Sequence, residues 1–537
     1  MAMMPPKTPL TSTRARVAVG AMILLSTLAF MRYRSISHGR TFHFDEWYWV
    51  LLRNDFSRHA LLDNHNGHLS IIPGFVFVSL FNTIGISRYW IYLSIGFLTH
   101  IVLAWLLYVM FSKKFGELIG VCIAAATLFL GSGAQNYLWS FQIGFMFSVI
   151  GYILGRLALE SEWKSKRIVL FLALCLTLGS SGIGIPTTAA LGVEALLRKW
   201  RLRNLWPFYT TGLAYSLWYL AYGRSDANGV YAHLIPKYAR DSASAVVAGV
   251  FDFTLDWGYL ALGILIGLVI VKLIRLRRVP APTAGALVFV FLFWSLTCLS
   301  RAQYWDVGAG RYVYAAFVAF LVILLDLLPT TRPNWLRVGA LLIVPISIWA
   351  SWSRMDSEAL FYKTWGQSVA AELLALDLHR DSVPIDYYPD KVRAPNVYAS
   401  SYFAAIDRLG SSPAVQKSAL GGLMKDARIE FDRVSLELGD VKVDIKEESD
   451  GSCDGLMTDS QRTRLRLNTG IQNLNAITQD VTVGFKRFGS RRSDVGQITI
   501  PKGSTAQVTV RHDSINHAWV VVQLNQGGGL CRSVNPN

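Results

Sequence analysis

The sequence predicts a polytopic α-helical membrane bundle, followed by a smaller α+β region outside the membrane. Three observations carry this prediction. Apolar blocks of about 20 residues recur between residues 17 and 352, basic clusters occupy the short junctions between them, and alternating β-branched runs follow residue 430. Of the 537 residues, 52% are hydrophobic and 16% are charged. Soluble proteins can be this apolar, but they do not arrange their apolar residues in blocks that match the thickness of a bilayer.

The apolar blocks predict about eleven membrane spans. A further apolar stretch, Leu69–Ile84, is interrupted by Pro73 and Gly74. If it crossed the membrane, every later junction would change sides, so we predict a short re-entrant or interfacial element there. The predicted spans are 17–33, 89–111, 116–131, 139–158, 167–179, 183–197, 205–222, 257–274, 283–299, 311–328 and 335–352.

The formal net charge of +16 does not predict a nucleic-acid partner, because its placement fits a membrane protein. The basic clusters lie beside span ends, which is the positive-inside signal, whereas nucleic-acid binding calls for a basic face on a soluble domain. We therefore expect a bacterial cytoplasmic membrane protein with a cytoplasmic N-terminus and an outward-facing C-terminal region. The clusters are Lys113–Lys114, Lys164–Arg167, Arg198–Arg203, Arg275–Arg278 and Arg332–Arg337.

The composition changes after Trp352. Asp356–Arg380 has apolar residues at helical spacing, and short alternating runs from about Glu430 predict a small β-sandwich. These features divide the chain into a membrane domain (1–352), an extracytoplasmic helical connector (353–429) and a β-sandwich-like domain (430–537). The predicted strands are Val434–Leu438, Val441–Ile445, Val481–Phe485, Gln497–Ile500, Ala506–Val510 and Ala518–Leu524.

Two of the five cysteines, Cys453 and Cys531, lie in the polar C-terminal region. Two cysteines in an exported domain predict a disulfide between them. The other three, Cys122, Cys175 and Cys298, lie inside apolar blocks and are expected to be small core residues.

The first predicted outer loop concentrates polar residues close to a span end. Asp45, Glu46, His65, Asn66 and His68 all fall within it. Carboxylates near the membrane plane cost free energy unless they are paired, hydrated or used. A structural alternative is that the Asp-Glu pair caps a helix, and the aromatic run between residues 47 and 49 is typical of interfacial anchoring.

These residue types suit group transfer onto a hydroxyl. A carboxylate such as Asp45 can take the proton of an attacking hydroxyl, and a cation can stabilise a departing phosphate. Arg88, Arg301 and Arg311, at predicted outer span ends, are candidate phosphate ligands. The loop between Arg301 and Arg311 also fits a tight polar connection that is closed by an ion pair.

The architecture and the motifs resemble the GT-C superfamily of membrane glycosyltransferases, and a group of bacterial membrane proteins within or near it. The resemblance covers roughly residues 15–350 and is most specific in the first loop. The matching motifs are Asp45-Glu46-Trp47, Asn66-Gly67-His68, Trp139-Ser140-Phe141-Gln142 and Gly310-Arg311-Tyr312.

This resemblance implies roles for the matching residues. Asp45 is expected to be the base or a metal ligand, with Glu46 as its partner. The resemblance also implies that the polar side chains of the other motifs bind substrate. These substrate-binding candidates are Asn66, His68, Gln142, Arg311 and Tyr312.

Many GT-C enzymes use a divalent cation, such as Mg²⁺ or Mn²⁺, held partly by an acidic residue of the next outer loop. That loop, Gly131–Tyr137, has no carboxylate here. A metal is therefore expected only if Asp45, Glu46 and His68 supply the ligands themselves.

The leading hypothesis is a transferase that moves a hexosyl or pentosyl group from a polyprenyl-phosphate-linked donor to an envelope glycan, lipid or protein. A transporter or flippase for lipid-linked glycans is an alternative, although transporters place polar residues at the bilayer midplane and usually contain repeats. A non-catalytic assembly protein is a third hypothesis. It would tolerate the replacement of Asp45, Glu46 and Arg311.

Overall fold

The computed structural model describes residues 13–328, 334–447, 456–457, 464–488, 496–511, 515, 517–525 and 529–533. The chain forms two compact units. The helical unit comprises Met1–His38, Leu52–Ile84 and Trp90–Tyr362. The C-terminal unit comprises Gly39–Leu51, Gly85–Tyr89 and Lys363–Asn537, so it takes two short segments from early in the chain. The predicted division at residues 352 and 429 stays a prediction.

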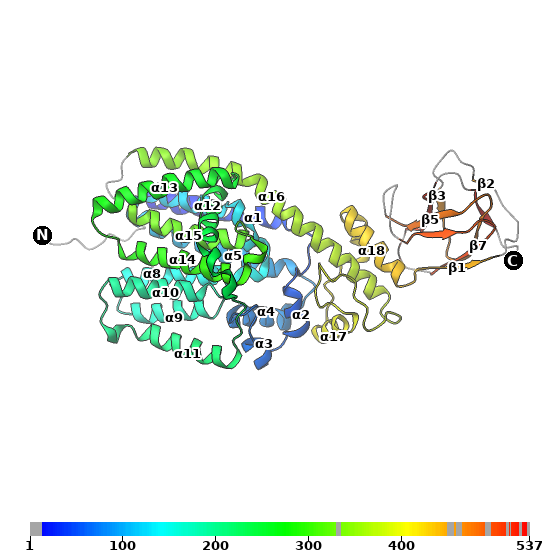
Figure 1. The fold of residues 1–537 in the computed structure, drawn as a ribbon, viewed down its shortest axis with the longest axis horizontal. Helices are drawn as coiled ribbons and strands as arrows, with labels where there is room; N and C mark the ends of the chain where they lie inside the picture. The colour runs from blue at the N-terminus through cyan, green and yellow to red at the C-terminus, as the bar shows by residue number, and fades with distance from the viewer. Residues whose placement is uncertain are drawn as a thin grey trace. The chain divides into compact units, whose positions relative to one another are not determined.

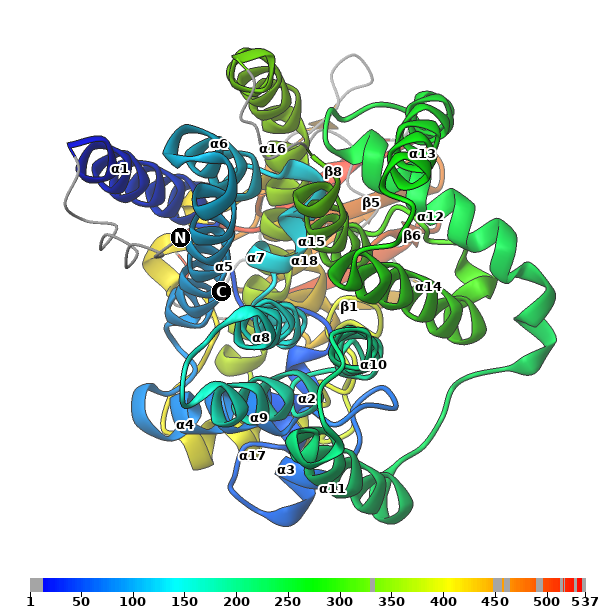
Figure 2. The same ribbon diagram turned by 90° about the vertical axis from the view of Figure 1, so that its left-hand side faces the viewer.

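Long helices make up most of the helical unit (Figure 1). Several of them run roughly parallel and are seen almost end-on in Figure 2, among them α5, α8, α10 and α15. The helices of this unit are α1 (Thr13–Ile36), α3 (Arg58–Leu62), α4 (Ile71–Ile84), α5 (Tyr89–Phe115), α6 (Glu117–Leu128), α7 (Ala134–Leu138), α8 (Ile143–Glu160), α9 (Lys166–Leu178), α10 (Gly184–Leu197), α11 (Trp206–Tyr222), α12 (Ile235–Gly249), α13 (Leu255–Leu276), α14 (Ala281–Arg301), α15 (Gly310–Leu327) and the first part of α16 (Asn334–Leu378).

Every predicted span coincides with a helix, so the polytopic bundle is confirmed. Within the described residues, seven helices are long and apolar enough to cross a membrane, or eight if a bent helix pair counts as one span. The figure of about eleven stays a prediction, because several predicted spans correspond to shorter helices. The stretch around Pro73 forms α4, whose 14 residues extend about 21 Å, less than the roughly 30 Å of a hydrocarbon core.

Helix α8 lies at the centre of the bundle because small residues let its neighbours approach closely. A β-carbon on Gly151 would lie 2.6 Å from both the Ala173 carbonyl oxygen and Thr177 Cγ2 of α9. Small residues at helix contacts are the usual way in which membrane helices gain packing contacts.

A buried charge cluster ties several helices together at one end of the bundle. Arg156 in α8 is 1% exposed and lies 2.9 Å from Glu160, 3.2 Å from Asp326 and 3.8 Å from Glu194. Lys114 lies 3.8 Å from Asp326. The cluster joins the ends of α5, α8, α10 and α15. The basic junctions at Lys113–Lys114 and at Arg198–Arg203 therefore both begin at this end of the bundle.

The C-terminal unit combines helices with two antiparallel sheets, which confirms the predicted β-sandwich. One sheet has the strand order β1-β7-β4-β9-β2 and the other β3-β8-β5-β6. The helices are α2 (Glu46–Leu52), which begins in this unit, the last part of α16, α17 (Ala399–Leu409) and α18 (Lys425–Glu437). The strands are β1 (Val441–Lys446), β2 (Leu456–Met457), β3 (Arg464–Arg466), β4 (Gly470–Ala476), β5 (Val481–Lys486), β6 (Ile498–Ile500), β7 (Thr505–Val510), β8 (Val520–Gln523) and β9 (Leu530–Ser533).

The first predicted strand, Val434–Leu438, is wrong, because nearly all of this segment belongs to α18. Its alternation is part of a longer helical pattern. Ala427, Phe431 and Val434 are buried at spacings of four and three residues in one cluster, and Leu438 packs against it.

The three cysteines of the apolar blocks are free thiols. Cys531 is buried in β9 and is disulfide-bonded. Cys453 lies outside the described residues, so its pairing with Cys531 stays a prediction.

Candidate functional site

Polar loops from distant parts of the chain meet at the end of the helical unit that lies opposite the Arg156 cluster. Asn64 Nδ2 donates to the Tyr222 carbonyl oxygen at 3.0 Å, and the Asn228 N–H donates to the Leu299 carbonyl oxygen at 2.8 Å. The start of α8 reaches the same end, since a β-carbon on Gly144 would lie 2.6 Å from the Ser180 carbonyl oxygen. The loops at 63–68, 180–184, 222–228 and 299–301 therefore surround one region.

His65 and His68 face each other across a two-residue turn. Their backbone N–H and carbonyl groups exchange hydrogen bonds of 2.9 and 3.0 Å. Asn66 and Gly67 both have positive φ, at 51° and 78°, which is typical of the Asn-Gly turn that joins paired strands. The geometry of the turn therefore explains why an asparagine stands at position 66. The expected contact of Asn66 with substrate stays a prediction.

The His68 ring lies in a buried position between three elements. A β-carbon on Gly182 would lie 2.5 Å from His68 Cε1, so the ring packs directly on the backbone between α9 and α10. Burial lowers the pKa of His68, the positive charge of Arg301 lowers it further, and the negative charge of Asp226 partly opposes this. His68 is therefore a neutral imidazole near neutral pH, with one cation and one carboxylate close by.

Asp226, whose negative charge acts on His68, is not among the site residues that the sequence predicts. It lies in the loop after α11, and its Oδ2 atom is 3.7 Å from the position of a β-carbon on Gly67. The predicted second outer loop lacks a carboxylate, and Asp226 brings one to this region from a loop roughly 90 residues further along the chain.

Within the part of the chain that the structure describes, two buried polar atoms in the same region have no hydrogen-bond partner. They are Gln142 Oε1, in a residue that is 4% exposed, and Ser180 Oγ, in a residue that is 1% exposed. Gln142 directly follows Phe141, whose ring centroid lies 4.7 Å from that of His65. A buried acceptor without a donor is costly, so such atoms are typical of sites that a ligand or a water completes. The structure thus places Gln142 beside the His65–His68 turn.

Arg311 and Tyr312 form a second polar group at the start of α15. The Arg311 guanidinium lies 4.7 Å from the Tyr312 ring centroid and 3.7 Å from the Asp306 carboxylate. The Arg311 N–H donates to Gln135 Oε1 at 2.9 Å, which ties α15 to the loop at 131–138. The ion pair with Asp306 is the tight polar connection that the sequence allowed as an alternative. The binding of phosphate by Arg311 stays a prediction.

Glu46 belongs to the C-terminal unit, where it is fully buried. Its Oε2 atom accepts the His43 N–H at 2.7 Å, and its Oε1 atom accepts the Tyr89 hydroxyl at 3.2 Å. Glu46, the first residue of α2, therefore holds the turn that precedes this helix. A role as the partner of Asp45 stays a prediction.

Asp45 follows a strained residue. Phe44 has φ of 44°, in the left-handed region that bulky side chains avoid. Such strain persists where the surroundings enforce it and is frequent at functional sites.

Arg88, the third predicted cation, is exposed and adjoins Tyr89 in the same unit. Trp47 and Trp49 are fully buried, so they pack inside the protein and are not exposed at the lipid interface.

The sequence allows a metal ion only if Asp45, Glu46 and His68 supply its ligands. Among the residues that the structure describes, no group of three His, Cys, Asp or Glu side chains is arranged to hold a metal ion. Glu46 already uses both oxygens for other contacts. The metal ion stays a prediction, and no step proposed below uses one.

Comparison with known proteins gives a similar solved structure. No family model and no curated protein matches the chain. The fold is similar to the crystal structure of ArnT from Cupriavidus metallidurans bound to undecaprenyl phosphate. The TM-score is 0.45 and the identity 13%, over 68% of this chain and 82% of that chain. At these values the likeness carries no conclusion about activity.

Proposed function

We propose that this protein is a membrane glycosyltransferase that moves a sugar from a polyprenyl-phosphate carrier to a glycan, lipid or protein acceptor of the cell envelope. The observation that carries the proposal is the polar region around His68. An imidazole, the charges of Arg301 and Asp226, and the unpartnered atoms of Gln142 and Ser180 gather at one end of an apolar bundle. Membranes tolerate such groups where they are paired, hydrated or used.

The polar region supplies the groups that sugar transfer needs. The acceptor oxygen attacks the anomeric carbon, the bond from that carbon to the carrier phosphate breaks, and the electron pair leaves with the phosphate. A carboxylate takes the proton of the acceptor hydroxyl. Asp226, in this region, is a candidate for this step. Asp45 belongs to the other unit and stays the candidate that the sequence predicts. Arg301 is our candidate for binding the departing phosphate, because its guanidinium can contact two phosphate oxygens.

The position of these groups favours a transferase over a transporter. Transporters hold their substrate near the bilayer midplane, at broken helices. The groups around His68 instead lie at helix ends and in loops, where a carrier phosphate at the membrane surface can reach them. The hexosyl or pentosyl nature of the sugar, the acceptor and the outward orientation are parts of the proposal that rest on the sequence.

The first test uses a deletion strain that is complemented with wild type, Asp45→Asn, Asp226→Asn or Arg301→Gln at matched protein levels. Mass spectrometry of the envelope glycans is expected to show one sugar lost in the deletion and restored by the wild type. Arg301→Gln and at least one of the two Asp variants should fail to restore it. Asp256→Asn, an exposed aspartate in the first turn of α13, is the matched control and should restore it.

A second test separates a transferase from a flippase. Purified protein in detergent is mixed with detergent-solubilised cell envelope of the deletion strain, which contains its lipids, glycans and proteins, and the products are analysed by mass spectrometry. A transferase forms a new glycosylated product in this single compartment, whereas a flippase forms none. Full complementation by all three variants, or no product from active wild-type protein, would overturn the proposal.

A further inference from the structure

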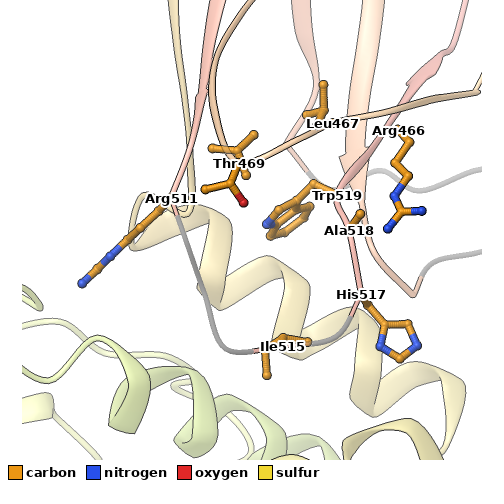
Figure 3. Close-up of a pocket in the computed structure, with 9 residues that line it drawn as sticks. Arg466, Leu467, Thr469, Arg511, Ile515, His517, Ala518 and Trp519 are labelled. Carbon is orange, nitrogen blue, oxygen red and sulfur yellow. The ribbon is translucent and has the colours of Figure 1, made fainter.

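A polar cavity of about 280 Å³ lies at one end of the sandwich in the C-terminal unit (Figure 3). Both sheets contribute to it: Arg466 ends β3, Val510 ends β7 and Trp519 directly precedes β8. The Leu467 N–H donates to the Trp519 carbonyl oxygen at 2.8 Å, which holds two sides of the cavity together. Its volume is near the lower limit of about 300 Å³ for small-molecule sites.

The ionisable residues that line this cavity are all basic. Among the lining residues that the structure describes, they are Arg466, Arg511 and His517, and none of these described residues is a carboxylate. Arg511 Nη1 donates to the neutral Ser382 Oγ at 3.3 Å. Within the described part of the chain, none of the three is paired with a carboxylate. The cavity therefore has positive charge that the described residues do not neutralise.

Trp519 adds a buried donor. The residue is 2% exposed, and its indole N–H has no hydrogen-bond partner among the residues that the structure describes. Figure 3 shows the indole between Thr469 and Ala518. The Arg487 guanidinium lies 4.1 Å from the centroid of the indole ring. That guanidinium pairs with Asp432 and Asp440, each at 3.2 Å, so its own charge is balanced.

The three basic residues of the cavity are exposed, so water already solvates their charges. The buried Trp519 N–H, in contrast, needs an acceptor that enters the cavity, and an acceptor with negative charge would also be attracted by the basic rim. A buried donor without a partner costs about 1–3 kcal/mol, and hydrogen bonds to an oxyanion are stronger than neutral ones. A lipid surface does not fit, because it would need exposed apolar residues at the rim. The large exposed apolar residues among the described strands and turns of the sandwich are Ile445, Ile471 and Ile477, and none of them lines the cavity.

We propose that this cavity binds the oxyanion of an acidic saccharide, meaning a sugar that carries a carboxylate or phosphate group. In this site the Trp519 N–H donates to an oxygen of the anion, and Arg466, Arg511 and His517 supply the positive charge. None of the residues that line the cavity belongs to the candidate transfer site. The oxyanion chemistry rests on the lining residues alone, whereas the choice of a saccharide rests on the proposed function. Calorimetry tests this binding separately from the complementation that tests the transferase.

The test measures binding by calorimetry, with the full-length protein in nanodiscs of zwitterionic lipid. The probes are trigalacturonic acid, glucose 6-phosphate, neutral galactotriose and inorganic phosphate. At least one acidic saccharide is expected to bind ten times more tightly than both galactotriose and inorganic phosphate. Its affinity should fall at least fivefold in Arg466→Gln and in Trp519→Phe, which keeps the aromatic ring but removes the N–H, and should weaken with salt.

Lys502→Gln is the matched control. Lys502 is exposed and precedes β7, whereas the cavity lies at the end of β7, roughly 20 Å away. This variant should bind as tightly as wild type. The proposal is overturned if neither acidic saccharide binds, if galactotriose or inorganic phosphate binds equally well, or if Lys502→Gln weakens binding as much as Arg466→Gln. Capture of the protein by phosphatidylglycerol vesicles through Arg466 would also overturn it, in favour of a lipid ligand.

Discussion

The ring of His68 packs against Gly182 so closely that a β-carbon on this glycine would lie 2.5–2.9 Å from three ring atoms. Real β-carbons do not approach other atoms this closely, so any side chain at position 182 must displace the imidazole or the turn between α9 and α10. The position of His68, and with it the polar region of the helical unit, thus depends on the absence of a side chain in another loop.

The first prediction follows from this contact. Gly182→Ala should reduce complementation of the deletion strain at least tenfold, because small displacements of positioning groups have large effects on rate. Overpacking should cost about 1–3 kcal/mol of stability. Gly192→Ala is the control, since its β-carbon would meet only Phe208, at 3.8 Å. Equal activity of the two variants would show that the contact does not matter.

The second prediction separates the roles of Asp45 and Glu46. Glu46→Gln keeps an oxygen that can accept the His43 N–H, so we expect near wild-type melting temperature and activity. Glu46→Leu removes the acceptor of both hydrogen bonds and should cost about 1–3 kcal/mol. Asp45→Asn should keep the melting temperature and lose activity. If Glu46→Gln folds normally but is inactive, Glu46 takes part in the chemistry.

The third prediction concerns acid stability. Burial lowers the pKa of His65 to about 3, from an ordinary value of 6.5. The unfolded chain therefore binds a proton between these pH values while the folded protein does not, so stability falls as the pH decreases from 6.5 towards 3. At pH 5 the loss is on the order of 2 kcal/mol. Thermal unfolding should show a smaller loss between pH 7 and pH 5 in His65→Phe than in wild type.

The fourth prediction addresses the opposite end of the bundle. Arg156→Met removes the buried cation of the cluster. Glu194 and Asp326 then keep only the partly exposed side chains of Arg198 and Lys114, so the loss should cost about 3 kcal/mol. Arg354→Met is the control and should cost about 1 kcal/mol or less, because Arg354 is 43% exposed and pairs with the partly exposed Glu358. Adding Glu194→Gln and Asp326→Asn to Arg156→Met should restore part of the stability. Equal melting temperatures for the two single variants would contradict this account.

Much of the fold could be predicted from the sequence because span length and charge placement are local signals. The strand β4, which lies inside its sheet, could not be predicted, since its buried positions include polar amides. Gln472 and Asn475 are 8% and 1% exposed, and Asn475 Oδ1 accepts the Thr505 hydroxyl at 2.6 Å. Because amides occupy buried positions of β4 and find their partners on a neighbouring strand, the sequence of β4 does not alternate between apolar and polar residues.

The candidate site could be predicted in part. The motif containing His68 led to the polar region, and Arg301 is indeed close to this residue. Asp226 could not be predicted, because it lies in an ordinary polar loop and comes close to His68 only through the packing of α11. The Asp45→Asn experiments above test whether Asp45 takes part in the same chemistry.

The C-terminal unit contains Gly39–Leu51, which is synthesised early, together with residues after Lys363, which are synthesised late. Thr41 Oγ1 donates to the Pro413 carbonyl oxygen at 3.1 Å, and the His43 and Trp365 ring centroids lie 5.3 Å apart. The ribosome makes these partners roughly 300 residues later, which at roughly 5–20 residues per second is tens of seconds. During that time most of the apolar helices have entered the membrane while the segment around Asp45 still lacks its packing partners. The ordering of this segment is therefore coupled to the completion of translation, and a nascent chain that stalls before Lys363 cannot complete it.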